Sequence, residues 1–316
     1  MTAASANKVT VPGDNRLDEL KLGNKTPFWH KIPIIKELRV AVGWQKGMLI
    51  TGLVLTAFFL LVAIFAPLIA PYSYAQLKGA DGVSFPAQAA PSSEHIWGTT
   101  AGGYDVFSRV VWGARTAVIA IVVAVLLSIF AGVLLGLVSG YFGGWLDNVM
   151  MRVVEVINGI PYMIVVILLM MVLDPGMGAI IVAYSLVGWT GMARLVRGQI
   201  VALKEQEFVI AAQAMGAKPS RIIAKHLLPN LLSVVIVNVT LAIPSVIFSE
   251  AFLSFIGLGV PIPMSSWGTL ANDAIIVFRS YPMQLFLPSL CICLTMLGFN
   301  LLGDGLRDAL DPRLKK

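Results

Sequence analysis

Six long stretches of the sequence contain no Asp, Glu, Lys or Arg, and they constrain the fold more than any other feature. Their apolar parts are residues 49–70, 116–146, 156–173, 175–193, 226–249 and 280–303. A helix of about 20 apolar residues crosses the hydrocarbon core of a bilayer, which is about 30 Å thick. Only 13% of all residues are charged, against about 25% in a typical soluble domain. We therefore predict an all-α polytopic membrane protein with six transmembrane helices, which excludes an ordinary soluble enzyme and a nucleic-acid-binding module.

Lysine and arginine are unevenly distributed among the segments that join these stretches. If the N-terminus is cytoplasmic, 19 of the 23 basic residues lie in cytoplasmic segments and four in outer ones. Short cytoplasmic loops of membrane proteins carry such an excess of basic residues. We therefore expect both termini to be cytoplasmic. The same bias explains the net charge of +6 without a nucleic-acid partner.

The ends of the apolar stretches divide the chain into five predicted parts. These are a cytoplasmic N-terminal segment (1–46), a first transmembrane helix (47–70), an extracytoplasmic loop (71–112), a domain of five helices (113–305) and a cytoplasmic tail (306–316). The outer loop and a second outer segment, residues 257–279, are either caps over a substrate path or packed connectors.

Three glycines recur at intervals of four residues in the second stretch. Gly132, Gly136 and Gly140 lie on one face of a helix, because residues four apart are neighbours on its surface. Small residues let another helix approach closely in lipid, where association depends on packing. We predict a helix-packing face there.

The cytoplasmic segment 202–230 is longer than a connection between two spans requires, since helix connections usually have about 2–8 residues. Residues 202–215 favour one helix, Gly216 stands where that helix would end, and Pro219 suits the first turn of a second helix that runs toward Pro229. Small side chains surround the turn, and basic residues flank it, namely Ala211, Ala212, Ala214, Gly216 and Ala217 with Lys218, Arg221 and Lys225. We predict that this turn enters a groove on another protein.

Several motifs between residues 47 and 316 together form a specific pattern. They are Ala211-Ala212 with Gly216 and Leu228-Pro229, Gly140-Tyr141-Phe142-Gly143-Gly144 followed by Asp147 and Met151-Arg152, Leu253–Gly259 with Ser266-Trp267-Gly268, and Asn300–Asp308 with Asp311-Pro312-Arg313. This pattern resembles permease subunits of ABC importers in the dipeptide/oligopeptide/nickel family. The first motif is similar to the cytoplasmic EAA loop of that family.

The resemblance implies a fold and a set of partners. The fold is the transmembrane domain of type I ABC importers, in a prokaryotic plasma membrane. The extended N-terminus and long outer loop are similar to the C-type subunit, which pairs with a second, B-type permease, two ATP-binding subunits and an extracytoplasmic substrate-binding protein. The implied function is ATP-driven import of oligopeptides or dipeptides by alternating access. The partner ATPases use ATP and Mg, and the chain binds no cofactor of its own.

In the resembling family the EAA loop is the coupling helix that fits into a cleft of the ATPase subunit. By this resemblance, the residues expected to couple the present chain to an ATPase are Glu207, Ala211, Ala212, Gly216, Ala217, Arg221, His226 and Pro229. Ile210 stands where the family has a glutamate, and we hypothesise that Glu207, one turn earlier, provides part of that polar contact.

Candidates for an outer gate or for the substrate path are Glu250, Tyr104 and Trp267. Tyr104 and Thr100 replace an arginine and an aspartate of the family motif near the presumed outer gate. Glu250 lies late in the fifth span, where it either acts on substrate or a gate or faces lipid headgroups. Arg152 and Glu155 are expected to form a structural ion pair.

The chain shows no catalytic residues and no metal site in its sequence. It lacks the Gly-x-x-x-x-Gly-Lys-[Ser/Thr] loop that binds ATP phosphates, its three histidines are scattered, and Cys291 and Cys293 lie in an apolar stretch. We therefore expect a transport subunit that is not an enzyme. Two alternatives stay open here, a nickel or metal-chelate importer of the same architecture and a self-contained channel or proton-coupled carrier.

Overall fold

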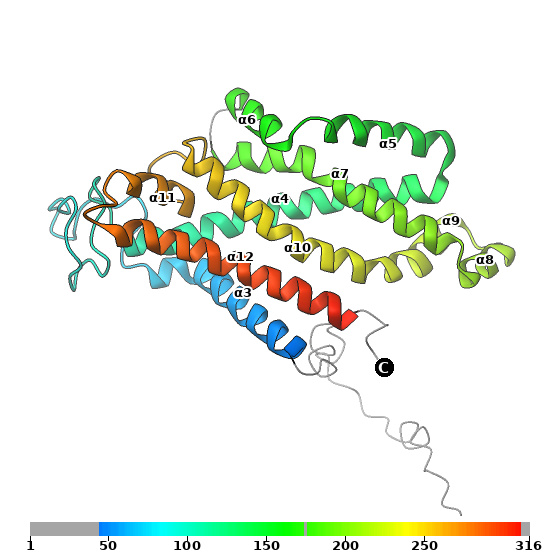
Figure 1. Ribbon diagram of the computed structural model, residues 1–316, viewed down its shortest axis with the longest axis horizontal. Coiled ribbons are helices and arrows are strands. Elements are labelled where there is room, and N and C mark those ends of the chain that lie inside the picture. Colours follow the sequence, from blue (N-terminus) through cyan, green and yellow to red (C-terminus); the bar gives the residue numbers. More distant parts are fainter. Residues whose placement is uncertain (1–43, 174–175, 311–316) are drawn as a thin grey trace, which may run out of the picture.

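The computed structural model describes residues 44–173 and 176–310, which form a bundle of helices (Figure 1). Most of the predicted segment 1–46 and residues 311–316 of the predicted tail lie outside this description. The helices are α3 (Trp44–Ile69), α4 (Val106–Phe142), α5 (Gly144–Asn158), α6 (Tyr162–Val172), α7 (Met177–Lys204), α8 (Glu207–Ala214), α9 (Pro219–Ile222), the π-helical turn η2 (Ile223–Leu227), α10 (Leu228–Phe255), α11 (Trp267–Ile275) and α12 (Pro282–Leu310).

Within the described residues, five helical segments are long and apolar enough to cross a membrane, and a sixth span results if α5 and α6 count as one. The structure differs here from the continuous helix predicted over 156–173, because α5 and α6 meet at an angle of 81°. The break lies at residues 159–161. Pro161 has no backbone N–H, and its ring disfavours helical backbone at the preceding residue.

The start of α4 and the presence of α11 also differ from the prediction, and local capping explains both. The structure begins α4 at Val106, well before the charge-free stretch from Thr116, because the Asp105 carboxylate accepts the backbone N–H of Ser108 at 2.7 Å. The short helix α11 was not predicted within 257–279. Ser266 and Thr269 form a capping box at its N-terminus, a pattern that satisfies free N–H groups of the first turn.

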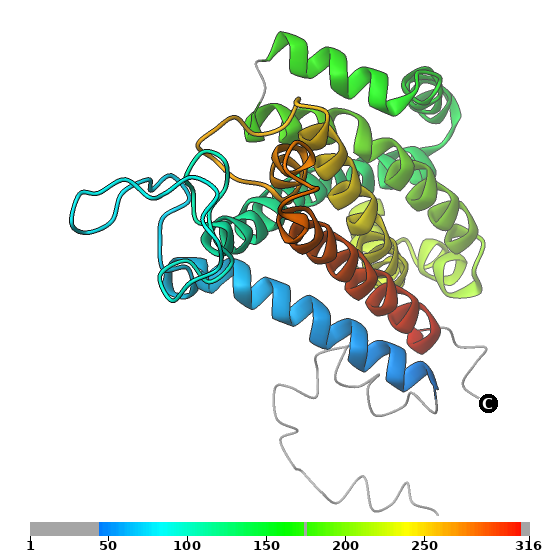
Figure 2. The same cartoon turned by 60° about the vertical axis from the view of Figure 1, so that its left-hand side comes forward.

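The centre of the bundle is the pair of helices α4 and α7, which lie side by side in both views (Figures 1 and 2). The glycine face of α4 points at α7. A Cβ atom at Gly136 would lie 2.6 Å from the carbonyl oxygen of Ala193, and one at Gly140 would lie 2.9 Å from that of Arg197. The two backbones are therefore in direct contact.

Two further layers flank this pair on opposite sides (Figure 2). On one side α3 packs against α12, where Gly52 leaves no room for a Cβ atom beside the backbone of Leu302. On the other side α5 and α6 lie against α7 and bury few residues, namely Val154, Val166 and Met170. The arm formed by α5 and α6 is therefore held by fewer apolar contacts than the other layers.

Substitution of Gly136 tests the backbone contact between α4 and α7. Alanine normally stabilises a helix relative to glycine by about 1 kcal/mol, but at Gly136 its Cβ would clash with the Ala193 carbonyl. We expect Gly136→Ala to destabilise the protein by about 1–3 kcal/mol and to lower its thermal unfolding temperature in detergent. Gly198→Ala is the matched control, because Gly198 in α7 has no atom within 4 Å of the added Cβ. Equal stability of the two variants would contradict the contact.

Candidate functional site

The segment that joins α7 to α10, residues 205–227, projects from one end of the bundle (Figure 1). We call it the α8–α9 loop. The other end of the bundle carries α11 and the long loop 70–105 (Figure 1). The two candidate regions of the sequence therefore lie at opposite ends of the molecule.

The start of the α8–α9 loop differs from the single helix predicted over 202–215. The helix α7 ends at Lys204, and α8 begins anew at Glu207. Gln206 has extended backbone, and its carbonyl accepts the N–H of Val209 at 2.9 Å. The break separates α8 from the axis of α7.

Gly216 makes the turn between α8 and α9. Its φ is +76°, a left-handed conformation that disfavours side chains with a Cβ atom. The N–H of Gly216 bonds to the carbonyl of Gln213 at 2.9 Å, and the N–H of Ala217 bonds to that of Ala212 at 3.0 Å. This pair of bonds is a Schellman motif. Pro219 follows at the first position of α9, as predicted.

One face of the loop is packed onto the ends of the long helices. Val209 and Ala212 of α8 are buried together with Ile222 and Leu227, against residues from α4, α7 and α10, namely Leu137, Val196, Ile200, Leu231 and Val235. Ala212 therefore does not belong to the exposed surface of small residues that the sequence predicted, and Ala217 is half-buried. The loop is a packed element rather than a free connector.

The opposite face of α8 is exposed. Glu207 and Ala211 lie on it, Gly216 is exposed in the turn that follows, and Arg221 is exposed in α9. Two large apolar side chains join them, Ile210 with 53% and Met215 with 81% of its surface accessible. Ile210 stands out in the sequence only as a replacement for the family's glutamate, but once Val209 and Ala212 are known to be buried, helical spacing places residues 207, 210, 211 and 214 outward. The tip of the loop thus presents small and apolar groups beside a carboxylate and basic side chains.

His226 and Pro229 lie where the loop enters α10. The ring of His226 lies 6.2 Å from that of Phe208 in α8, which ties the two arms of the loop together. The π-helical turn precedes Pro229, with the N–H of Leu228 bonded to the carbonyl of Ile223. A proline ring collides with the carbonyl four residues earlier in a regular helix, and the wider turn leaves room for it.

At the opposite end, a buried histidine–aspartate pair fixes the start of α4. Nδ1 of His95 lies 2.9 Å from Asp105, and both side chains are buried. Partial burial, together with the Asp105 and Glu94 carboxylates, raises the pKa of Tyr72. The Tyr72 hydroxyl therefore keeps its proton, and it donates to the carbonyl of Glu94 at 3.1 Å. The loop 70–105 is folded onto the helices.

Tyr104 and Trp267 both pack within this end of the chain. The Tyr104 ring lies 4.6 Å from the guanidinium of Arg109, a buried residue that donates to the carbonyl of Met264 at 3.4 Å. The indole N–H of Trp267 donates to the carbonyl of Val110 at 2.9 Å, and the side chain is 1% exposed. Within this chain Trp267 therefore holds α11 to α4.

Glu250 is buried inside the bundle and does not face lipid headgroups, so that alternative is wrong. Only 1% of its surface is accessible, and its carboxylate accepts a hydrogen bond from Ser254 at 2.8 Å, one turn further along α10. Arg152 and Glu155 form the expected ion pair, at 2.7 Å on the exposed surface of α5. Among the described residues, His, Cys, Asp and Glu side chains form no group of three that could hold a metal ion.

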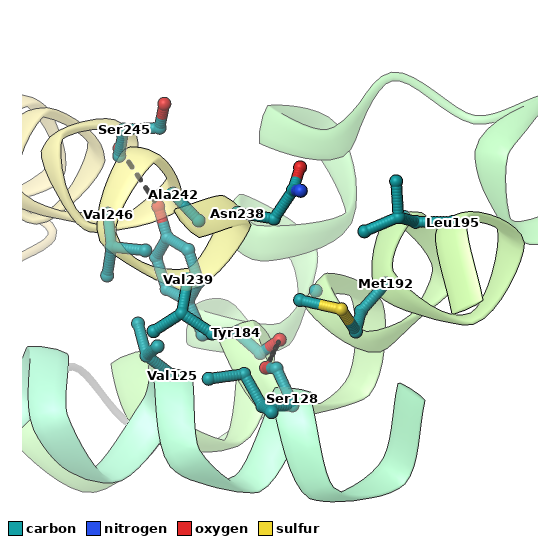
Figure 3. A pocket seen from close by; sticks show the side chains of 13 residues that line it. Val125, Ser128, Tyr184, Met192, Leu195, Asn238, Val239, Ala242, Ser245 and Val246 are labelled. Atoms are coloured by element: carbon teal, nitrogen blue, oxygen red, sulfur yellow. Dashed lines mark hydrogen bonds between the residues drawn. The ribbon is translucent and has the colours of Figure 1, made fainter. Parts of the chain in front are cut away.

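Between the two ends, α4, α7 and α10 line an open pocket of about 430 Å³, which we call the cavity (Figure 3). Its lining is apolar apart from a few neutral polar side chains, namely Ser128, Tyr184, Asn238 and Ser245. The Tyr184 hydroxyl donates to the carbonyl of Ser245 at 3.3 Å. Ser128 bonds to the carbonyl of Tyr184 at 3.2 Å. No charged side chain lines this cavity, and the sequence alone gives no sign that the cavity exists.

Comparisons with known proteins place the chain in a family. Residues 132–316 match the family described as binding-protein-dependent transport system inner membrane component, and residues 45–90 match the N-terminal TM domain of oligopeptide transport permease C. The oligopeptide transport system permease protein OppC of Bacillus subtilis is 44% identical over 86% of this chain and 90% of its own length. The dipeptide transport system permease protein DppC of the same organism is 44% identical over 86% and 84%. OppC of Escherichia coli is 43% identical over 84% and 86%.

A solved structure supports the fold. A chain of the inward-facing MetNI methionine ABC transporter matches 64% of this chain and 97% of its own length, with a TM-score of 0.52 and 19% sequence identity. The family matches and the similar permeases confirm the resemblance inferred from the sequence motifs. The chain belongs to the family of binding-protein-dependent transport system inner membrane components, as an ABC importer permease of the dipeptide/oligopeptide/nickel group.

Proposed function

We propose that the chain is one permease subunit of an ATP-driven importer that moves oligopeptides or dipeptides across a prokaryotic plasma membrane. The α8–α9 loop carries this proposal, because it is a packed, protruding turn with an exposed face of small and apolar groups. The relatives named as oligopeptide and dipeptide permeases support peptides over metal chelates as cargo. A self-contained channel or carrier would leave this loop without a role.

The orientation follows from the distribution of basic residues. With six spans and both termini in the cytoplasm, the α8–α9 loop is cytoplasmic, where the ATP-binding subunits are available. The loop 70–105 and α11 then face outward, toward a substrate-binding protein. A second, B-type permease completes the membrane part, and two ATPase subunits hydrolyse ATP with Mg.

Packing of the loop suggests how the ATPases act on the membrane helices. Val209 and Ala212 belong to one buried cluster with residues of α4, α7 and α10, so a displacement of α8 passes through this cluster to the ends of those helices. The cavity lies between the same helices. We infer that it is part of the path that opens alternately to the two sides of the membrane.

The neutral lining suits peptides of varied sequence. Peptide groups need hydrogen-bond partners when they leave water, and the hydroxyl and amide groups of the cavity provide them. A fixed charge in the wall would favour some side chains over others by attraction or repulsion. The binding protein then selects the peptides.

Affinity purification of the tagged chain in mild detergent tests the assembly. We expect a second permease and two ATPase subunits in stoichiometric amounts, identified by mass spectrometry. Recovery of the chain alone, with the ATPases present but unbound, would overturn the proposal.

A bulky side chain at position 216 should prevent the α8–α9 loop from docking onto an ATPase subunit. We expect Gly216→Trp to abolish ATP hydrolysis coupled to uptake, because the indole would stand on the face that meets the ATPase, while the long helices stay folded. Gly216→Asn is the control, since asparagine adopts left-handed backbone more readily than other residues. The measurements are ATPase recovery in the purification and uptake per ATP in proteoliposomes. Normal coupling in Gly216→Trp would contradict the docking role.

Removal of a carboxylate tests the hypothesis on Glu207. We expect Glu207→Ala to weaken ATPase binding modestly, by about 0.5–1.5 kcal/mol for one lost hydrogen bond, with unchanged thermal stability because the residue is exposed. Titration of the ATPase subunits onto the reconstituted permease measures the affinity. An unchanged affinity would show that Glu207 does not replace the missing glutamate at position 210.

A large side chain in the cavity should block the passage of peptides and leave the binding of the ATPase subunits unchanged. Ala242 lines the cavity, and we expect Ala242→Trp to reduce peptide uptake at least about tenfold, while ATPase recovery in the purification stays normal. Val54→Trp is the control, because Val54 is 60% exposed on α3, away from the cavity. Undiminished uptake by Ala242→Trp would exclude this cavity from the path.

A further inference from the structure

One carboxylate joins three helices near the α8 end of the bundle. Asp147 in the first turn of α5 accepts hydrogen bonds from Nε of Arg197 at 3.0 Å and from its Nη2 at 2.6 Å. The hydroxyl of Ser139, in the last turn of α4, donates to the same carboxylate. We call this arrangement of Asp147, Arg197 and Ser139 the Asp147 clasp.

The geometry of the clasp is specific. Two parallel N–H groups of one arginine on one carboxylate fix direction as well as distance, and they form the stronger kind of ion pair. The side chain of Asp147 is only 13% exposed, and that of Arg197 is 40% exposed. The pair is therefore partly shielded from water.

The clasp matters because α5 has little else to hold it. Val154 is the one residue of α5 that is buried. At the far end of α5, the Thr190 hydroxyl of α7 donates to the side chain of Asn158 at 3.1 Å. Side-chain hydrogen bonds thus join α5 to α7 at both of its ends. Beyond Asn158 the chain bends by 81° into α6.

The end of α7 is in turn part of the packing under the α8–α9 loop. Val196 and Ile200 are buried in one cluster with Val209 and Ala212 of α8. Lys204, the last residue of α7, donates to the carbonyl of Tyr141 at 2.6 Å. Arg197 therefore lies on the helical segment that any displacement of α8 moves first.

We propose that Asp147 and Arg197 are positioning residues that make α5 move together with α8, so that a displacement imposed on the α8–α9 loop reaches the arm formed by α5 and α6. This inference rests on the proposed function, in which partner ATPases displace α8. The bend at residues 159–161 is where the motion of α5 passes to α6.

The same helix supplies a matched control. Arg152 and Glu155 also form an ion pair at 2.7 Å, but their side chains are 79% and 58% exposed, and they join α5 only to itself. Such a pair contributes little and links no second helix. Loss of this pair should leave coupling unchanged.

The first experiment measures peptide uptake per ATP hydrolysed by the complete complex in proteoliposomes. For Asp147→Asn and for Arg197→Gln we expect the ratio to fall at least about fivefold, the lower limit for coupling between sites. The exchanged pair Asp147→Arg with Arg197→Asp should recover part of the ratio, whereas Arg152→Gln should keep it. Unchanged coupling in both single variants would overturn the proposal.

The second experiment tests the common motion directly and does not depend on these variants. Spin labels are placed at Arg152→Cys on α5 and Gln213→Cys on α8, with Cys291 and Cys293 replaced by serine. With the clasp intact, we expect the same label distance in the nucleotide-free complex and in the complex trapped with ATP and vanadate. With Asp147→Asn added, the distance should change between the two states.

The outcomes separate this inference from the proposed function. A label distance that changes with nucleotide while the clasp is intact would overturn the inference, even in a complex that couples normally. Failure of the chain to bind ATPase subunits would instead overturn the proposed function on which it rests. If Asp147→Asn does not assemble, the distance in the protein with an intact clasp still decides.

Discussion

The direct contact between the backbones of α4 and α7 is the constraint on which the rest of the structure depends. Helices in lipid gain nothing from hiding apolar surface, so close packing has to hold them together. At Gly136 and Gly140 the α7 carbonyls occupy the space of a missing Cβ atom, which fixes the two helices in one register. That register sets the walls of the cavity, through Ser128 and Tyr184. It also sets the floor beneath α8, through Leu137 and Val196.

The sequence predicts the parts of this architecture that depend on local chemistry. Long apolar stretches identify spans, glycines at intervals of four identify a close contact, and Gly216 before Pro219 identifies a turn. The sequence fails where contacts between distant segments decide the structure. Arg109 and Arg115 precede the apolar stretch of α4, yet the helix that Asp105 caps includes both, and Arg109 is buried against the Tyr104 ring and the carbonyl of Met264.

In the candidate site too, the sequence predicts what depends on local chemistry and fails to predict what depends on tertiary contacts. Which residues belong to the α8–α9 loop follows from the sequence, but the direction of each side chain does not. Ala211 and Ala212 are the same type of residue. Only the packing of α8 in one cluster with residues of α4 and α7 places Ala212 inside and leaves Ala211 outside. Trp267 is a candidate gate residue in the sequence, and only the structure shows that its indole N–H bonds to the carbonyl of Val110 in α4. Asp147 is a similar case, since only the position of Arg197 in the structure shows that this carboxylate joins α5 to α7.

The two ends of the bundle are held by different kinds of interaction, and this difference bears on the direction of motion. At the α11 end, hydrogen bonds fasten the loop 70–105 to several helices, among them Gln284 to the carbonyl of Thr99 at 2.9 Å and Trp112 to that of Tyr72 at 3.2 Å. Directional hydrogen bonds of this kind oppose sliding of the loop 70–105 along these helices. At the α8 end, apolar packing and the Asp147 clasp join the helices into one block. Under the function proposed above, a force applied to α8 would therefore act on the ends of α4, α7 and α10 that share its buried cluster, away from the fastened end.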